Sequence, residues 1–137
     1  MSNMFIDLGL KDEKIIIDLN KLIYIESEGR GSTGVYLEFR GIEANDTPNV
    51  THFQDISFDD ATERILRMWG SSFLYVKTYS HRPIIINKEY ITAVYADRID
   101  KSISNIELDR GVISVDIDVP TIEKLLTGEL KYKDVYK

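Results

Sequence analysis

The chain contains one stretch of sequence twice, as IIIDLNKLIYIE at residues 15–26 and as IIINKEYITAVY at residues 84–95. The two stretches align without a gap at an offset of 69 residues, and the alignment sets Asp18 on Asn87. A repeat of this length is typical of one supersecondary unit that is used twice. The repeat therefore predicts the architecture of the chain better than any single motif does.

The same order of predicted elements follows in both halves, namely strand, strand, loop, strand, turn, strand and helix. The helices are predicted at residues 58–69 and 121–126. Because the connections are short, sequential strands are expected to be antiparallel. The sequence thus predicts an α+β fold that is mostly antiparallel β. Two tandem repeats, at about 15–69 and 73–128, each end in a helix and together form a single domain of 137 residues. Residues 129–137 are expected to be a tail that is mobile or pairs with a partner.

The isoleucine triplet at residues 15–17 is β-branched and uninterrupted, which predicts a strand buried on both faces, and the triplet at residues 84–86 is predicted to be a strand. Ser57 is placed to cap the first predicted helix and Asp118 the second. A half of ~60 residues buries only a marginal core. We therefore expect the two helices to share one interior, or each half to pack on another protomer.

The composition is that of a folded protein, with 43% hydrophobic and 29% charged residues. Cysteine is absent, which excludes disulfides, thiolate catalysis and cysteine-based metal sites. No apolar run approaches the roughly 18 residues that span a bilayer, and the N-terminus has no signal-peptide pattern. We expect a cytoplasmic protein without a membrane partner.

The formal net charge is −6, and all of this excess lies in the first half of the chain. Residues 1–69 hold 7 basic and 13 acidic residues, whereas residues 70–137 hold 10 of each. An acidic chain repels the phosphate backbone unless it has a local basic patch. The charge therefore disfavours DNA as a partner without excluding it.

Catalytic and metal-binding patterns are weak. The two histidines, His52 and His81, lie in no nucleophile motif, and no spacing predicts that they converge with a carboxylate on a metal. Asp59 and Asp60 are explained by the start of a helix. We expect a protein that is not an enzyme and that uses no cofactor.

Two loops carry groups that could bind an anion. The glycine-rich loop 29–34 can point several backbone N–H groups at one anion, and it contains Arg30, Ser32 and Thr33. His81 and Arg82, just before the second isoleucine triplet, could bind phosphate or a nucleobase. The alternative interpretations are a flexible hairpin connection for the first loop and a solvated turn for the second.

The order of segments resembles a known family. The run LIYIESEG at residues 22–29, a middle helix, Phe73, His81–Arg82 and Ile85–Ile91 resemble the LytTR DNA-binding domain. The patterns of that family are IxYIEA and FxRxHRSYxVNxxxI. The second half, from 84 to 126, also resembles the FlbD-like flagellar module.

The LytTR resemblance covers about residues 15–126. It implies that the domain reads DNA with loops rather than with a helix. The contacts would lie near Arg30 and at His81 and Arg82, and Asn87 would be structural.

Two functional interpretations of the sequence follow. The first is a non-enzymatic regulatory module of a bacterium or phage that contacts a protein partner or captures a small, nucleotide-like anion. It rests on the acidic charge, the duplicated scaffold and tyrosines such as Tyr36, Tyr132 and Tyr136, which suit interfaces. This module is expected to be a homo-oligomer. The alternative is a LytTR-like transcriptional regulator that binds DNA.

Overall fold

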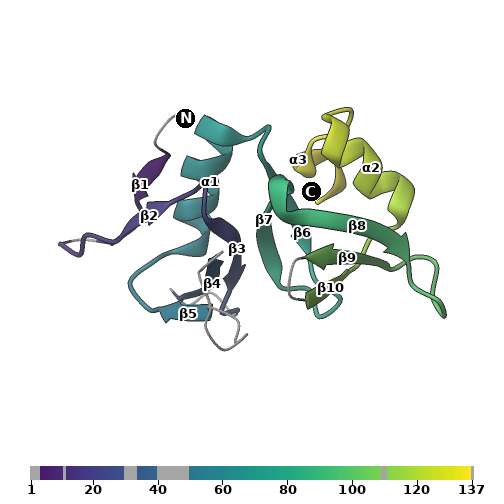
Figure 1. The fold of residues 1–137 in the computed structure, drawn as a ribbon, viewed down its shortest axis with the longest axis horizontal. Helices are drawn as coiled ribbons and strands as arrows, with labels where there is room; N and C mark the ends of the chain where they lie inside the picture. The colour runs from purple at the N-terminus through teal and green to yellow at the C-terminus, as the bar shows by residue number, and fades with distance from the viewer. Residues whose placement is uncertain (1–3, 11, 30–33, 40–49, 109–110, 137) are drawn as a thin grey trace.

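The structure is a computed structural model that describes residues 4–10, 12–29, 34–39, 50–108 and 111–136 (Figure 1). The strands are β1 (Phe5–Asp7), β2 (Ile16–Asp18), β3 (Leu22–Ser27), β4 (Val35–Phe39), β5 (Val50–Phe53), β6 (Phe73–Lys77), β7 (Pro83–Asn87), β8 (Ile91–Ala96), β9 (Ser104–Leu108) and β10 (Gly111–Val115). The helices are α1 (Phe58–Trp69), α2 (Val119–Thr127), α3 (Tyr132–Val135) and a 3₁₀ turn, η1 (Lys88–Tyr90).

These strands form three antiparallel sheets. β1 pairs with β2, the order β5-β4-β3-β7-β6 makes a five-stranded sheet, and the order β10-β9-β8 makes a three-stranded sheet. The predicted α+β fold, mostly antiparallel β, with two tandem repeats that each end in a helix, is confirmed.

The repeated stretch makes the same local structure twice. Asp18 Oδ1 accepts a hydrogen bond from Asn20 N at 3.0 Å, and Asn87 Oδ1 accepts one from Glu89 N at 3.1 Å. These side-chain turns end β2 and β7 and start the next strand in each copy.

The bulges of the sheets repeat as well. The β3–β4 register shifts between Leu22 and Tyr24, and the β8–β9 register shifts between Ile91 and Ala93. The two shifts are separated by the offset of 69 residues that relates the sequences. A bulge at the same position in both copies bends and twists the two equivalent strands in the same way.

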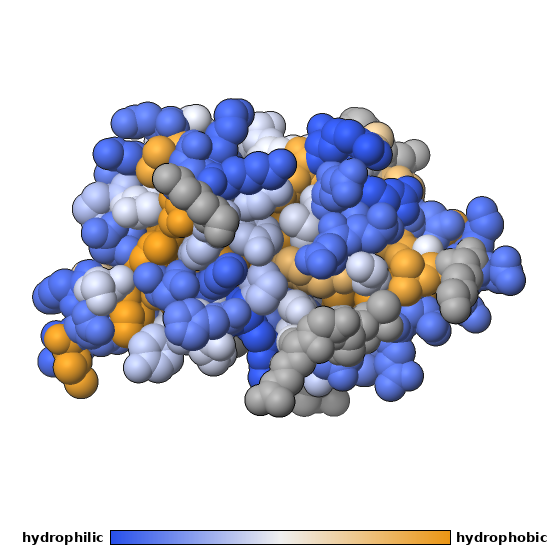
Figure 2. All heavy atoms as spheres, turned by 180° about the vertical axis from the view of Figure 1, so that it is seen from behind, coloured by the Kyte–Doolittle hydropathy of each residue, from blue (hydrophilic) through white to orange (hydrophobic). Residues whose placement is uncertain are grey.

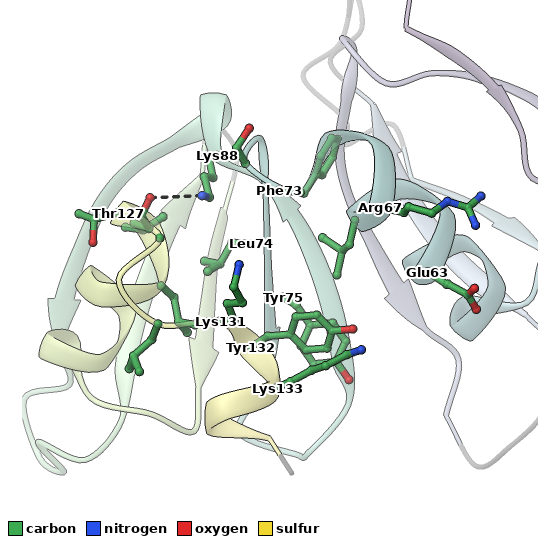
Figure 3. Close-up of a pocket in the computed structure, with 17 residues that line it drawn as sticks. Glu63, Arg67, Phe73, Leu74, Tyr75, Lys88, Thr127, Lys131, Tyr132 and Lys133 are labelled. Atoms are coloured by element: carbon green, nitrogen blue, oxygen red, sulfur yellow. Dashed lines mark hydrogen bonds between the residues drawn. The ribbon is translucent and has the colours of Figure 1, made fainter.

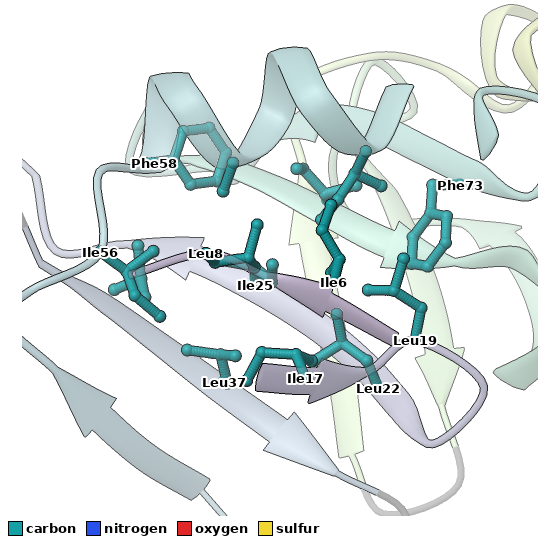
Figure 4. Close-up of a cluster of buried hydrophobic side chains, with 14 residues drawn as sticks. Ile6, Leu8, Ile17, Leu19, Leu22, Ile25, Leu37, Ile56, Phe58 and Phe73 are labelled. Carbon is teal, nitrogen blue, oxygen red and sulfur yellow. The ribbon is translucent and has the colours of Figure 1, made fainter. Parts of the chain in front are cut away.

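The five-stranded sheet has a hydrophobic core on each face. α1 and β1–β2 cover one face, and the three-stranded sheet with α2 covers the other (Figure 1). Ile85 on β7 enters the first core, shown in Figure 4, whereas Ile84 and Ile86 enter the second. The expectation that the two helices share one interior is therefore wrong, because alternate residues of β7 serve different cores.

The two isoleucine triplets are buried differently. Ile84, Ile85 and Ile86 are all at most 1% exposed because β7 lies inside the five-stranded sheet. Ile16 is 62% exposed because β2 belongs to a two-stranded sheet that is covered on one face. The burial on both faces that was predicted for the first triplet is therefore wrong, and it is the second triplet that is buried on both faces. The face of the molecule that is turned away from the viewer in Figure 1 is mostly hydrophilic, and its apolar surface lies in separate patches (Figure 2).

Both predicted caps are present, although α2 begins at Val119 rather than at residue 121. Ser57 Oγ accepts from Asp60 N at 3.3 Å, and Asp118 Oδ1 accepts from Thr121 N at 3.0 Å. The C-terminal segment differs from the expected mobile tail, because α3 packs against β6 and Tyr136 Oη accepts from Lys77 N at 3.0 Å.

Candidate nucleic-acid interface

The tip of the β6–β7 hairpin is a closed turn over residues 78–82. Thr78 N donates to Arg82 O at 2.8 Å, His81 N donates to Thr78 O at 2.7 Å, and Arg82 N donates to Thr78 Oγ1 at 3.1 Å. His81 has a φ of 67°, in the left-handed region that residues other than glycine seldom occupy. The hydrogen bonds hold this conformation, so the backbone positions of His81 and Arg82 at the tip are fixed.

The second repeat supports the tip from one side. Tyr79 N donates to Ser114 O at 2.8 Å, and Asp116 N donates to Lys77 O at 3.2 Å. His81 Nδ1 lies 3.6 Å from Asp116 Oδ2, and the His81 side chain is 78% exposed. His81 therefore points into solvent beside the carboxylate of Asp116.

The end of β3 supports the tip from the other side. Arg82 Nη1 lies 3.6 Å from Glu26 Oε2. A side-chain carbon placed on Gly29 would lie 4.0 Å from Arg82 Nε. Burial raises the pKa of Glu26, and the guanidinium of Arg82 opposes that rise. The start of the β3–β4 connection and the hairpin tip are thus neighbours in space.

Three of the predicted site residues lie outside the described residues: Arg30, Ser32 and Thr33. The described ends of their loop are close together, because Glu28 N donates to Gly34 O at 3.1 Å. Gly29 and Gly34 have φ values of 107° and 139°, which glycine alone adopts easily. The structure brings Arg82 to the first end of this loop and places His81 beside it on the hairpin tip.

Sequence reasoning missed the carboxylates of this interface. His52 Nε2 on β5 lies 3.0 Å from Glu28 Oε2, and the His52 ring lies 4.8 Å from the ring of Tyr36. His52, like His81 and Arg82, therefore has a carboxylate beside it. One signal could have found Glu26. If the two repeats pair antiparallel through β3 and β7, Glu26 falls opposite Ile84, two residues from Arg82.

The chemistry of this surface is that of a polar contact site. Among the described residues, no group of three or more histidine and acidic side chains could hold a metal ion. Within the same part of the chain, no helix is long and apolar enough to cross a membrane. The site offers a guanidinium and two imidazoles, each next to a carboxylate.

Comparison with known proteins identifies a fold. No protein-family model matches the chain, and no curated protein matches it. The chain is similar to a solved LytTr DNA-binding domain from Bacillus cereus, with a TM-score of 0.50 and 17% sequence identity. The match covers 93% of this chain and 99% of that chain. The resemblance to the LytTR domain is thereby confirmed at the level of the fold.

The likeness corrects the main functional interpretation of the sequence. That interpretation, a module for protein contacts or for a small nucleotide-like anion, gave the acidic net charge more weight than the order of segments. The matched structure is a DNA-binding domain, and it favours the alternative interpretation instead.

Proposed function

We propose that this chain is a DNA-binding regulatory domain that contacts duplex DNA with loops. The observation that carries the proposal is the position of Arg82. It lies on the tip of a rigid hairpin and beside the glycine that opens the β3–β4 connection. The fold likeness supports the proposal by analogy, since a fold alone does not define a function.

The geometry suits contact with the phosphate backbone. Arginine forms two parallel hydrogen bonds to a phosphate, and backbone N–H groups of a glycine-containing loop can add further donors. Arg82 is 46% exposed and His81 is 78% exposed, so both can reach a ligand without a change in the fold. Arg30, Ser32 and Thr33, in the adjoining loop, belong to the same proposed contact surface.

The neighbouring carboxylates explain how an acidic chain could bind DNA selectively. Glu26 lies beside Arg82 and Asp116 lies beside His81, and a phosphate must compete with these carboxylates. We therefore expect weak non-specific binding that depends strongly on salt. Sequence-specific contacts would have to supply the rest of the affinity.

The test is a titration of a fluorescent 20-base-pair duplex with the full chain, followed by anisotropy at low and moderate salt. Arg82→Ala should weaken binding and lower the slope of log K against log salt by about 0.9, the value for one phosphate contact. Lys124→Ala, which removes an exposed cation on α2, should leave binding nearly unchanged. Absence of binding at low salt would end the proposal.

A gain-of-affinity variant provides the complementary test. Glu26→Gln removes the carboxylate 3.6 Å from Arg82 and should tighten DNA binding. Glu123→Gln changes the net charge equally at an exposed position on α2 and serves as its control. Equal effects of the two variants would mean that total charge, rather than this interface, governs binding.

Three further properties remain proposals. We propose that binding rather than catalysis is the activity and that the protein works in the cytoplasm. We also propose a homo-oligomer on DNA, because paired copies could contact two half-sites. Sedimentation of the protein with and without duplex would test the last point, and a single copy per duplex would contradict it.

A further inference from the structure

A cavity of about 640 Å³ lies between the C-terminal end of α1, strand β6 and the α2–α3 connection (Figure 3). This volume is within the range of about 300–1,000 Å³ that is usual for small-molecule sites. The lining comes from the first part of β6, whereas the proposed DNA contact lies beyond the other end of that strand. The cavity is therefore separate from the candidate nucleic-acid interface.

The floor of the cavity is apolar and preformed. Leu74 lies in its middle, between Lys88 at one end and the rings of Tyr75 and Tyr132 at the other (Figure 3). The two tyrosine rings are 4.6 Å apart and pack at an angle of 37°. Leu74 is 2% exposed and belongs to the second hydrophobic core, so the floor is held by the packing of the fold.

The charged side chains that line the cavity are mostly basic, whereas the protein as a whole is acidic. The lining holds four basic side chains and one acidic side chain, in a chain whose net charge is −6. Among the described residues, none of the four basic side chains has an ion-pair partner. These side chains are Arg67, Lys88, Lys131 and Lys133, and the acidic one is Glu63.

Lys88 is the best-positioned of these cations. Its ammonium donates to Leu126 O at 3.2 Å, and an ammonium has three donors in all. The side chain is half-buried at one end of the apolar floor, and burial lowers the pKa of Lys88. An anion bound there would be held in a less polar setting than an exposed lysine provides.

We propose that this cavity binds an apolar molecule that ends in a carboxylate, of the fatty-acid type, with the carboxylate on Lys88. The hydrocarbon part lies over Leu74 toward the two tyrosine rings. Lys131 stands on the rim above this path and adds a second positive charge. The site is a second one, and its occupancy does not depend on DNA binding.

The test uses octanoate and 1-octanol, which differ only in the carboxylate. Each is titrated into the ¹⁵N-labelled full chain, and amide shifts report both the location and the affinity of binding. Octanoate should shift the amides of Ser71, Leu74 and Gly128, which line the cavity. It should bind at least about fivefold more tightly than 1-octanol, as expected for one partly screened ion pair.

Variants of the rim assign the charge. Lys88→Met and Lys131→Met should each reduce octanoate affinity by about threefold or more and leave 1-octanol unchanged. Lys131 is exposed, so its variant tests the site without risk to the fold. Lys124→Met, on the same helix as part of the lining but outside it, is the matched control and should have no effect. Equal affinity for acid and alcohol, shifts outside the lining, or unchanged affinity in both rim variants would each overturn the proposal.

Discussion

The substitution Asn87→Ala should reveal how the two repeats are joined. Asn87 is 5% exposed, and its Nδ2 donates to Leu22 O at 3.0 Å and to Leu19 O at 3.3 Å. Its Oδ1 accepts from Glu89 N at 3.1 Å. The side chain thus links, through hydrogen bonds, the turn that follows β2 in the first repeat to the turn that follows β7 in the second.

The expected cost follows from these three hydrogen bonds. Each contributes a net ~1 kcal/mol, and leaving buried carbonyls unpaired adds a further penalty, so Asn87→Ala should cost about 3–4 kcal/mol. The matched control is Asp18→Ala at the equivalent position, where the carboxylate accepts from Asn20 N. That substitution should cost about 1 kcal/mol.

The assay is urea unfolding followed by circular dichroism, with the unfolding slope checked for both variants. The midpoint of Asn87→Ala should fall several times further than that of Asp18→Ala. Equal losses, or a loss below about 1 kcal/mol for Asn87→Ala, would show that Asn87 does not join the repeats.

Three other predictions concern stability. Ile85→Ala should cost about 2–5 kcal/mol because the side chain is fully buried, whereas Ile16→Ala, at 62% exposure, should cost under about 1 kcal/mol; similar losses in denaturant unfolding would contradict the assigned cores. Tyr136→Phe should cost about 1–3 kcal/mol, since Lys77 N–H loses its acceptor, and hydrogen exchange at that amide should accelerate. Burial raises the pKa of Glu26, so folding disfavours its carboxylate. Glu26→Gln should therefore stabilise the fold at pH 7, and the gain should fade as the pH falls toward 4.5 and be absent below it; a gain that persists below pH 4.5 would contradict this sign.

Local patterns in the sequence predicted much of the fold. The caps predicted at Ser57 and Asp118 are both present. Each side chain accepts a hydrogen bond from a backbone N–H three residues further along the chain, in the first turn of its helix. The repeat itself was visible because Asp18 and Asn87 terminate equivalent strands with the same type of turn.

The burial of equivalent strands and the packing of the C-terminal segment depend on tertiary contacts that the local sequence pattern does not predict. The two isoleucine triplets are identical in sequence, yet Ile16 is exposed while Ile85 is buried, because their strands occupy an outer and an inner position in different sheets. The C-terminal tail reads as polar, but Tyr136 Oη accepts from Lys77 N and donates to Asp116 Oδ1 at 2.8 Å, which fixes it on β6. Such long-range contacts leave no periodic signal.

The sequence indicates some residues of the candidate site but not the residues that lie next to them in space. His81 and Arg82 were identified from their residue types and from the resemblance to the LytTR domain. The neighbouring carboxylates Glu26 and Asp116 come from a strand and a connection far away in sequence. Net charge says little about this surface, because it averages over the local charge pairs that set the potential there.

Amide shifts of the ¹⁵N-labelled chain on addition of a 20-base-pair duplex test the central claim most directly. Contact at this interface should give shifts that are concentrated at residues 79–82 and at Gly29, that shrink as salt is raised, and that are lost in Arg82→Ala. Shifts centred elsewhere, such as on α1 or α2, or no shifts at low salt, would contradict it.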